Sequence, residues 1–404
     1  MAKHTVKRAY KYRFYPTQQQ EELLLRTFGC VRLVWNRMLE HRTNAWHQEG
    51  RSISYAESSK ILTQWKSEPE LAFLNEVSSV PLAQSLRHLQ DALSRFWSKQ
   101  NKYPRFKSRK KSRKSATFTQ MAFRLKQSKH GSPHPEIWLA KCDAPLDIVW
   151  SRSLPEGAQP SSVTVSQDRA GRWFVSLLVE EQIQQLEPLD AREHAIGVDM
   201  GLHHLAILST GEKISNPRHT ARDARALARA QRAHARKQKG SNNREKARLK
   251  VARIQARTSD RRKDFLHKLT TSMIRENQTI VIEDLAVQNM SRRSKSGGSH
   301  KKGLNRAILD ASWSELRSQL EYKAAWYGRE LIVLSQWFPS SQLCSECGQQ
   351  TGPRGDLAMR SWKCSACGAA HDRDVNAAKN VLAAGLAASV CGDGRSLRWA
   401  QASA

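Results

Sequence analysis

The spacing of hydrophobic residues predicts a helical segment near the start of the chain. Apolar side chains recur at intervals of three and four residues between positions 23 and 38, which is the period of an amphipathic helix. Capping-box sequences stand at Thr17–Gln20 and Ser54–Glu57. A further apolar stripe runs from 82 to 96. We therefore expect residues 17–100 to fold as a helical subdomain.

The hydrophobic period changes to two in the next part of the chain, which predicts strands. Alternating runs occupy 136–140 and 146–150, and two longer runs between 163 and 179 are joined by a turn at 168–171. Alternation of this kind is typical of strands with one buried face. We expect a small β-barrel or sheet here, followed by a polar linker at 181–193.

Beyond this linker, apolar strands alternate with helices, which is typical of an α/β domain. Ala195–Asp199 is expected to form a hairpin with Leu205–Leu208, and Thr279–Glu283 is a second apolar strand. Asp374 is expected to begin a helix that also carries Asn376. Two predicted strands and one predicted helix therefore carry a carboxylate at one end.

The charge of the chain indicates a polyanionic partner. Its 404 residues include 67 Lys and Arg against 37 Asp and Glu, which gives a formal net charge of +30 and an isoelectric point near 10.2. Such a surface favours nucleic acid, because each neutralised phosphate releases condensed counterions. A ribosomal-type scaffold and a protein that binds an anionic membrane are the alternatives. With 39% hydrophobic residues, the chain can bury at least one full core.

The sequence also predicts a cytoplasmic protein with reduced cysteines. The N-terminus lacks the apolar stretch of roughly 7–15 residues that a secretory signal requires. No run of about 18 apolar residues is present that would span a membrane. Cysteines in a chain without an export signal are poor material for disulfides, so metal binding becomes the more natural use of a cysteine cluster.

Two segments concentrate the positive charge. Lys99–Lys114 holds nine Lys or Arg and no acid, with Tyr103 and Phe106 among them, a mixture typical of backbone tracking with base stacking. Arg218–Lys263 holds 17 Lys or Arg against three acids and is expected to form a helical hairpin with a basic face. A solvated linker and a merely soluble helix pair are the alternatives. The residues that we expect to contact nucleic acid are Lys102, Tyr103, Arg105, Phe106, Lys107, Arg225, Arg229, Arg232, Arg236, Lys237 and Arg253.

Four of the seven cysteines form two CxxC pairs that are separated by sixteen residues, and each pair is followed by glycine. This spacing predicts a tetrahedral zinc site on two knuckles, whereas a redox CxxC would usually occur once. Four thiolates leave no position for water, so the zinc is expected to be structural. The four predicted ligands are Cys344, Cys347, Cys364 and Cys367. The remaining cysteines, expected to be packed or incidental, are Cys30, Cys142 and Cys391.

Three carboxylates are candidates for a second metal site. Asp199 and Glu283 end apolar strands, and Asp374 begins a predicted helix. Each has an ordinary alternative, because strand ends are often solvated and aspartate is a good helix cap. Together they could converge on Mg²⁺ or Mn²⁺, which prefer oxygen ligands. A pair of such ions can activate water on one side of a phosphodiester and stabilise the leaving oxygen on the other.

The order of these motifs resembles the TnpB family, which is encoded by transposons and related to type V CRISPR effectors. The resemblance covers nearly the whole chain, and no acidic position departs from the family pattern. The motifs that carry it are GVDMG around Asp199, VIEDL around Glu283, the helix end Tyr322–Gly328, Pro339–Cys347, HDRDVNAA around Asp374, the opening Tyr12–Pro16, and Lys102–Lys107.

This resemblance implies an α+β multidomain fold. Residues 1–16 would supply the first strand of a wedge domain, 17–114 a helical recognition lobe, and 115–190 the β-barrel wedge domain. Residues 191–404 would form a RuvC-like nuclease domain of RNase H type, an α/β fold. A zinc ribbon would be inserted into the nuclease domain at 341–370.

The resemblance also implies an RNA-guided, metal-dependent endonuclease that cuts double-stranded DNA beside a short adjacent motif. The guide RNA would come from the transposon end, and base pairing would read most of the target. Asp199, Glu283 and Asp374 would hold two Mg²⁺ or Mn²⁺ ions. Asp372 is the weaker candidate, because the family pattern places the ligand directly before x-Asn-Ala-Ala. One chain per RNA is expected, in a prokaryotic cytoplasm and at the nucleoid when bound to DNA.

Three other functions stay open from the sequence. A nuclease-silent relative would act as an RNA-guided repressor, a transposase would use the same acids to join DNA strands, and a structural RNA-binding protein would account for the charge and the zinc alone. Ser291–Asn305 is rich in Ser, Gly, Lys and Arg and is expected to be a mobile loop. It would be either a lid over the acidic site or a passive connection.

Overall fold

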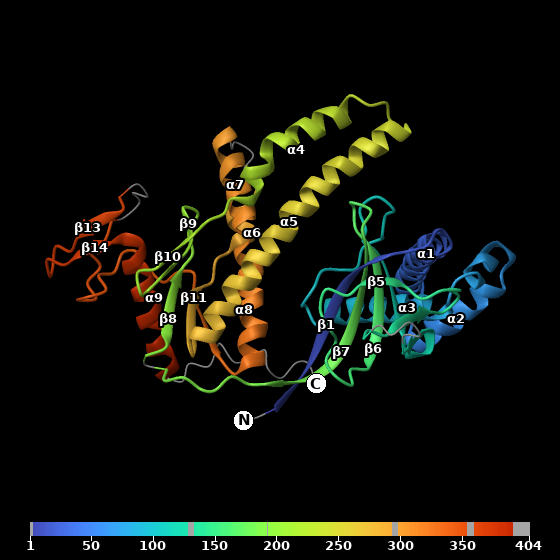
Figure 1. Ribbon diagram of the computed structural model, residues 1–404, viewed down its shortest axis with the longest axis horizontal. Helices are drawn as coiled ribbons and strands as arrows, with labels where there is room; N and C mark the ends of the chain where they lie inside the picture. The colour runs from blue at the N-terminus through green and yellow to red at the C-terminus, as the bar shows by residue number, and fades with distance from the viewer. Residues whose placement is uncertain (1–2, 128–132, 192, 293–297, 354–358, 391–404) are drawn as a thin grey trace. The chain divides into compact units, whose positions relative to one another are not determined.

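The computed structural model describes residues 3–127, 133–191, 193–292, 298–353 and 359–390. The chain forms two compact units that divide between Glu181 and Gln182, at the start of the predicted linker. We call Thr5–Glu181 the N-terminal unit. The C-terminal unit is the chain from Gln182 onward, and residues 3 and 4 group with it (Figure 1). In the described part of the chain, every helix is too short or too polar to cross a membrane.

Helices make up the first part of the N-terminal unit, as the apolar spacing predicts. They are α1 (Gln18–Glu49), α2 (Tyr55–Ser67), the 3-10 helix Pro69–Asn75 and α3 (Ser79–Trp97). Their apolar faces meet in one core that includes Val34, Met38, Leu62 and Leu86. Burial of these faces, rather than helix propensity, supplies most of the stability of such helices.

The two predicted capping boxes behave differently. At the start of α1 both halves form, because the Thr17 side chain accepts from the Gln20 N–H at 3.2 Å and the Gln20 side chain accepts from the Thr17 N–H at 3.1 Å. At the start of α2 the Ser54 hydroxyl accepts from the Glu57 N–H at 3.1 Å. The reciprocal half predicted there is wrong, because the Glu57 carboxylate pairs with Arg51 instead.

A five-stranded sheet completes the N-terminal unit. Its strands are β1 (Lys3–Tyr15), β2 (Lys114–Thr119), β5 (Asp147–Val149), β6 (Pro160–Gln167) and β7 (Trp173–Gln184). They lie in the order β2-β6-β7-β1-β5, so the first strand of the chain sits between two much later ones. Val163, Val165, Val175 and Leu177 fill the buried face, as the alternation predicts. A separate hairpin joins β3 (Phe123–Lys126) and β4 (Glu136–Leu139).

The C-terminal unit is built on a second five-stranded sheet. Its strands are β8 (Ala195–Asp199), β9 (His204–Leu208), β10 (Lys213–Ser215), β11 (Thr279–Glu283) and β12 (Glu330–Leu334). The order is β10-β9-β8-β11-β12. β8, β11 and β12 are parallel, and β9 and β10 are antiparallel. The predicted hairpin and the predicted second apolar strand are both confirmed.

Helices cover both faces of this sheet. They are α5 (Asn242–Glu276), α8 (Trp313–Tyr327) and α9 (Arg373–Val390). Ile280 and Ile282 of β11 pack in one cluster with α5 and α8. Val281, between them, packs with Val381 of α9 on the other face. This two-sided burial explains why β11 is a continuous apolar run rather than an alternating one.

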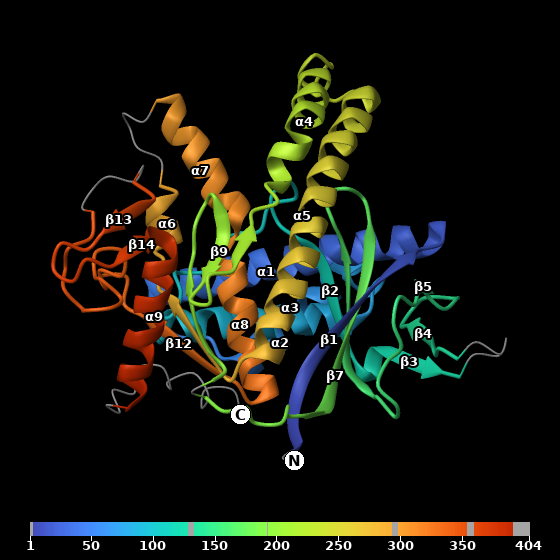
Figure 2. The same ribbon diagram turned by 60° about the vertical axis from the view of Figure 1, so that its left-hand side comes forward.

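The predicted basic hairpin is confirmed. α4 (His219–Ala235) and α5 lie side by side and extend beyond the sheet as a two-helix arm (Figures 1 and 2). α4 has no buried residue. Its base is held by Asp223, which pairs with Arg261 and accepts from the Thr258 hydroxyl at 2.8 Å. The arm is therefore a strongly basic element with little core of its own.

The expectation of a mobile loop at Ser291–Asn305 is wrong for its second half. α6 (Val287–Met290) ends before this segment, and α7 (Ser299–Ala311) begins inside it. Ile308 and Ala311 of α7 are buried in the same cluster as α5 and α8. Because helix propagation is favourable once one turn is packed, α7 extends back over the polar residues. Residues 293–297 lie outside the described part of the chain.

Candidate active site and metal centre

Asp199 and Glu283 stand at the carboxyl ends of two adjacent strands. β8 and β11 are parallel with Val198 opposite Ile282, so the next residue on each strand is an acid. Each strand is apolar and mostly buried up to its acid, which sets where the acid emerges. In open α/β sheets, the carboxyl ends of parallel strands form the usual edge for ligand binding.

α9 brings the third carboxylate toward the same edge. A Cβ at Gly197 of β8 would lie 2.1 Å from the Ala378 carbonyl oxygen of α9. A Cβ at Gly385 of α9 would lie 2.4 Å from the Val281 side chain. Because both positions need glycine, the helix packs closely against the sheet. Its first turn, which contains Asp374, then lies near the strand ends.

Asp372 and Asp374 have different contacts. Asp372 Oδ1 accepts from the N–H groups of Asp374 and Val375, both at 3.1 Å, and Oδ2 pairs with Lys213 at 2.5 Å. These contacts are those of a helix N-cap. The Asp374 carboxylate lies 3.3 Å from the Arg360 guanidinium. The ordinary capping role therefore belongs to Asp372, which supports the sequence-based preference for Asp374 as a ligand.

Burial and the neighbouring acids perturb Asp199. The pKa of Asp199 is raised to about 7 by burial first and then by the negative charges of Glu283 and Asp374, while Arg373 opposes the shift. Burial also raises the pKa of Glu283, against the hydrogen bond that Ser340 donates to it. Clustered buried carboxylates are favourable as anions when a cation compensates them. The site therefore has the charge that a divalent metal would neutralise.

The carboxylate oxygens are spread more widely than the ligands of one ion. Among the residues that the structure describes, the four cysteines are the one set of three or more His, Cys, Asp or Glu ligand atoms lying within 4.8 Å of one another. Two ions separated by about 3.5–4 Å would span a wider set of oxygens. Anionic oxygen donors are also what Mg²⁺ and Mn²⁺ prefer, so the donor set fits the predicted ions.

The four predicted zinc ligands come together on two turns, one between β12 and β13 (Ser361–Lys363) and one between β13 and β14 (Ala370–Asp372). Gly348 and Gly368 follow the two pairs with φ of +73° and +75°, which glycine adopts without strain. Sulfur atoms from opposite turns approach to 3.7 Å, and all four lie within 4.8 Å of one another. One tetrahedral ion could bridge such a group. The ligands are Cys344, Cys347, Cys364 and Cys367.

Sequence reasoning missed the side chains that support these thiols. β13 (Ser361–Lys363) and β14 (Ala370–Asp372) form a short antiparallel ribbon before α9. From β14, His371 Nε2 lies 3.1 Å from Cys344 Sγ. The Thr351 hydroxyl lies 3.0 Å from Cys364 Sγ. Contacts of this kind orient metal ligands, and the CxxC pattern carries no information about them.

The predicted nucleic-acid residues at 102–107 divide between the surface and the interior. Tyr103 and Phe106 expose 40% and 63% of their area. Lys107 instead lies over the Trp35 ring, with its ammonium 3.5 Å from the ring centroid, and burial lowers its pKa to about 8. Lys102 and Arg105 are exposed. The aromatic pair is therefore better placed for stacking than Lys107 is for phosphate contact.

Two exposed tryptophans adjoin this segment, and sequence reasoning missed them. Trp46 of α1 and Trp97 of α3 lie edge to face, with ring centroids 5.6 Å apart. Phe96 contacts both Trp97 and Tyr103, each at 5.2 Å between centroids. The helix period alone could not reveal this surface, because it forms where two helices distant in sequence meet.

A basic groove of about 490 Å³ lies between α4 and α5. Alanines and Ile254 line it together with four cations. Six residues of the arm were predicted to contact nucleic acid, and two of them, Arg229 and Arg253, line the groove. The other four are exposed elsewhere on α4 or just after its C-terminal end. The four cations of this groove are Arg229, Lys250, Arg253 and Arg257. The predicted residues outside it are Arg225, Arg232, Arg236 and Lys237.

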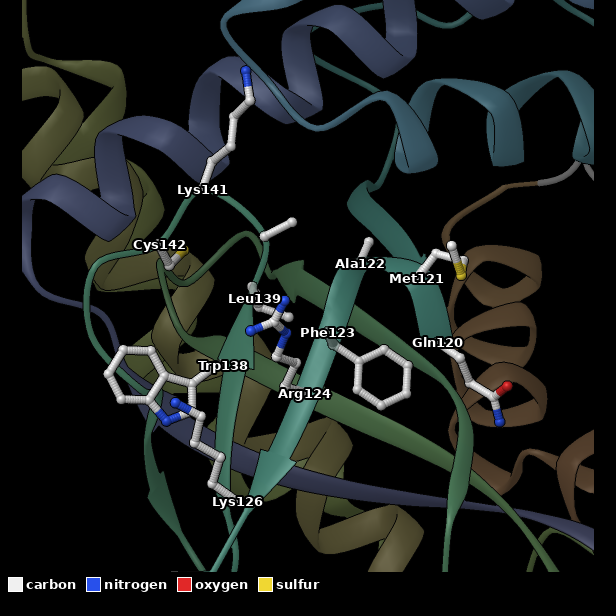
Figure 3. Close-up of a pocket in the computed structure, with 11 residues that line it drawn as sticks. Gln120, Met121, Ala122, Phe123, Arg124, Lys126, Trp138, Leu139, Lys141 and Cys142 are labelled. Atoms are coloured by element: carbon white, nitrogen blue, oxygen red, sulfur yellow. The ribbon is translucent and has the colours of Figure 1, made fainter.

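A second pocket, of about 310 Å³, lies on the β3–β4 hairpin (Figure 3). Arg124, Lys126 and Trp138 line it, and the Lys126 ammonium lies 4.8 Å from the centroid of the Trp138 ring. Met121 beside them exposes 91% of its area. None of the lining residues belongs to the C-terminal unit, which carries the acids and the cysteines.

Three family models match the chain. A model described as "Probable transposase", of the OrfB_IS605 family, matches residues 174–294, which include Asp199 and Glu283. A model of the Cas12f1-like TNB domain matches 313–381, which includes the four cysteines and Asp374. A helix-turn-helix domain model matches 1–51.

The fold resembles that of a CRISPR effector. The solved structure of a Cas12f1–sgRNA–target DNA complex matches with a TM-score of 0.55 over 93% of this chain and 98% of that chain, at 14% identity. An identity this low shows the fold alone. The chain therefore has the α+β multidomain fold of the Cas12f1 class.

Full-length relatives show the family. A Streptomyces pristinaespiralis protein named "Putative RNA-guided DNA endonuclease" is 60% identical over 389 residues, which are 96% of this chain and 92% of the relative. InsQ of Escherichia coli K12, which bears the same description, is 35% identical over 397 residues, which are 95% and 94% of the two chains. The chain belongs to the OrfB family of transposon-encoded proteins, also called TnpB.

Proposed function

We propose that this protein is a transposon-encoded, RNA-guided DNA endonuclease that hydrolyses phosphodiesters with divalent metal ions. The observation that carries the proposal is the position of Asp199 and Glu283 at the carboxyl ends of two adjacent parallel strands, with Asp374 close enough to act on the charge of Asp199. The names of the full-length relatives supply the substrate class. The fold of the Cas12f1 complex supports the same reading.

The three acids would hold two Mg²⁺ or Mn²⁺ ions. Such a pair activates water on one side of a phosphodiester and stabilises the leaving oxygen on the other. The protein orients the ligands: Ser340 donates to Glu283 at 2.5 Å, and Arg373 places positive charge beside Asp199. These interactions would orient the carboxylates for metal binding. Because metal-activated water would be the nucleophile, the reaction would need no serine or cysteine nucleophile.

The C-terminal unit would be a RuvC-like nuclease domain of RNase H type. A sheet with three parallel strands and an antiparallel edge, flanked by helices on both faces, supports this assignment. The four cysteines would hold structural zinc in a ribbon inserted before α9. In the N-terminal unit, the five-stranded sheet with β1 would belong to the wedge domain, and α1 to α3 would form the recognition lobe.

The partners would be a guide RNA from the transposon end and double-stranded target DNA, with one chain for each RNA. Base pairing would read the target, and the protein would read a short adjacent motif. The net charge of +30 and the basic arm support contacts with the phosphate backbone.

Guided cleavage tests the proposal. The chain is expressed with the DNA that flanks its gene, purified with any bound RNA, and incubated with a plasmid library and Mg²⁺. Cutting confined to plasmids that match the guide, beside one shared motif, is the expected result. Target binding without cutting would identify a repressor, and joined strands would identify a transposase. Purification without bound RNA would contradict the proposal.

We expect the groove between α4 and α5 to contact phosphates of the bound nucleic acid. Changing its four cations, Arg229, Lys250, Arg253 and Arg257, to glutamine should weaken RNA binding at low salt. The slope of log affinity against log salt should become shallower by about 3 units if all four cations contact phosphates, because each lost phosphate contact removes roughly 0.7–0.9 of a unit. Filter binding over a salt titration measures this slope.

The control is a pair of cations on α5 that do not line the groove. Arg248 and Lys268 of α5 each pair with an acid of their own helix, Glu245 at 2.5 Å and Asp264 at 2.8 Å. Their replacement by glutamine should change the slope by less than the groove substitutions do. An unchanged slope in the groove variant would remove the arm from the interface.

A further inference from the structure

Ser340 connects the acidic site to the segment that leads into the first zinc knuckle. Its hydroxyl donates a 2.5 Å hydrogen bond to Glu283 Oε1. Glu283 ends β11, whereas Ser340 lies in the loop that follows β12, the neighbouring strand. Ser340 is 7% exposed, so water has little access to replace its hydroxyl. The hydrogen bond therefore ties the loop to the end of the strand that carries the acid.

Two asparagines of α9 hold this loop in place. Asn380 Nδ2 donates to the carbonyl oxygens of Ser340 and Leu343, both at 2.8 Å. Asn376 Nδ2 donates to the Leu343 carbonyl at 2.7 Å, and its Oδ1 accepts from the Ser345 N–H at 2.9 Å. Both asparagines are buried. Because buried amides are costly when unpaired, these contacts fix the path of the loop.

The same helix carries Asp374 in its first turn. Helix α9 thus carries a proposed metal ligand and also the two asparagines that hold the Ser340 loop. Loop residues that are held in this way can keep a side chain in one rotamer, which a mobile connection cannot do.

We propose that Ser340 is a positioning residue that fixes the orientation of the Glu283 carboxylate for divalent-metal binding. The inference rests on the proposed nuclease function and deepens it. With Oε1 engaged by the Ser340 hydroxyl, the Oε2 atom of Glu283 would be left to bind a metal ion. Hydrogen-bond partners of metal ligands commonly set both the orientation and the basicity of the ligand.

Mn²⁺ binding to the full-length chain, measured by electron paramagnetic resonance without nucleic acid, tests the proposal. Ser340→Ala is expected to weaken Mn²⁺ binding by about 10- to 100-fold. Ser340→Thr keeps the hydroxyl and should restore most of the affinity. Ser340→Cys, which donates a weaker hydrogen bond, should fall between them and gives the same comparison if the alanine variant does not fold.

Two controls separate positioning from general damage. Ser341→Ala makes the same change at the next residue and should leave Mn²⁺ affinity as it is. In a Glu283→Gln background, Ser340→Ala should cause no further loss, because its effect passes through the carboxylate. An equal added loss in that background, or equal affinity of Ser340→Ala and the unaltered chain, would overturn the proposal. Since the assay involves neither RNA nor cleavage, its outcome is independent of the guided-cleavage test.

Discussion

Changing Asp199 to asparagine is expected to abolish guided DNA cleavage while guide-RNA binding stays within a few-fold of the original. Asparagine keeps the shape of the side chain but loses the anionic oxygen that the proposed ions need. The rate of cleavage should fall by about a thousandfold or more, as for the loss of a group that stabilises charge in the transition state. Single-turnover cleavage with excess protein–RNA complex, together with filter binding of the RNA, measures both quantities.

Asp284→Asn is the matched control. Asp284 directly follows Glu283, but its carboxylate pairs with Arg317 and about half of its side chain is exposed. The substitution removes one acid beside Glu283 but leaves the three proposed metal ligands unchanged, so the rate of cleavage should stay within a few-fold of the original. Cleavage by the Asp199→Asn variant at the original rate would exclude Asp199 as a metal ligand.

The Asp199→Asn substitution should also change the pH dependence of stability in the metal-free protein. Burial and like charges raise the pKa of Asp199 from 3.8 to about 7, so the protonated carboxyl stabilises the fold below pH 3.8 and this stability is lost as pH rises through about 7. Asparagine is neutral at every pH. The variant should therefore unfold at a higher temperature than the original chain at pH 8, by several degrees, and with little difference near pH 4. Added Mg²⁺ should stabilise the original chain alone.

Loss of the zinc site is the second large effect that we expect. Cys344→Ser should remove the metal and disorder the ribbon, because the ribbon has a very small apolar core made of Cys344, Trp362 and Cys364. The segment from Ser340 to Cys344 would then be held by Asn376 and Asn380 of α9 but no longer by the zinc ion. Cleavage should fall by about 10- to 100-fold or more, since supporting contacts of metal ligands have effects of that size. RNA binding should change much less.

The control for this variant is Cys142→Ser. Cys142 is a half-buried thiol of the N-terminal unit and takes no part in the cysteine cluster. Elemental analysis should find one zinc per chain in the original protein and in this control, and none in Cys344→Ser. Limited proteolysis then reports whether the ribbon has opened. Full cleavage by zinc-free protein would show that the ribbon does not support the acidic site.

Local patterns were sufficient where the structure depends on local chemistry. The period of apolar residues predicted α1 and α3, and the capping box at Thr17 formed as expected, because its partners are three residues apart. The glycine-bounded CxxC pairs likewise predicted the cysteine cluster, since each turn presents two thiols by itself. Such features depend little on the remainder of the fold.

Local patterns were not sufficient where a residue outside the pattern supplies the contact. Glu57 pairs with Arg51 instead of closing the second capping box. Polar residues at the start of α7 became helical because Ile308 and Ala311 are buried elsewhere in the unit. The ammonium of Lys107, which we predicted to contact nucleic acid, lies over the Trp35 ring. In each case burial, or a charge outside the local pattern, outweighs a local preference of a few tenths of a kcal/mol.

The sequence by itself determined which residue types are available to the site: strand-borne acids, a helix-borne acid and four cysteines in zinc spacing. Only the tertiary structure decided which of them are coupled. The parallel register of β8 and β11 sets two acids side by side, and the close approach at Gly197 brings α9 toward them. The tertiary structure also made Asp372 the N-cap of α9 and brought the Ser340 hydroxyl within hydrogen-bonding distance of Glu283. These outcomes depend on the packing of elements far apart in the chain, and no local pattern of residues encodes that packing.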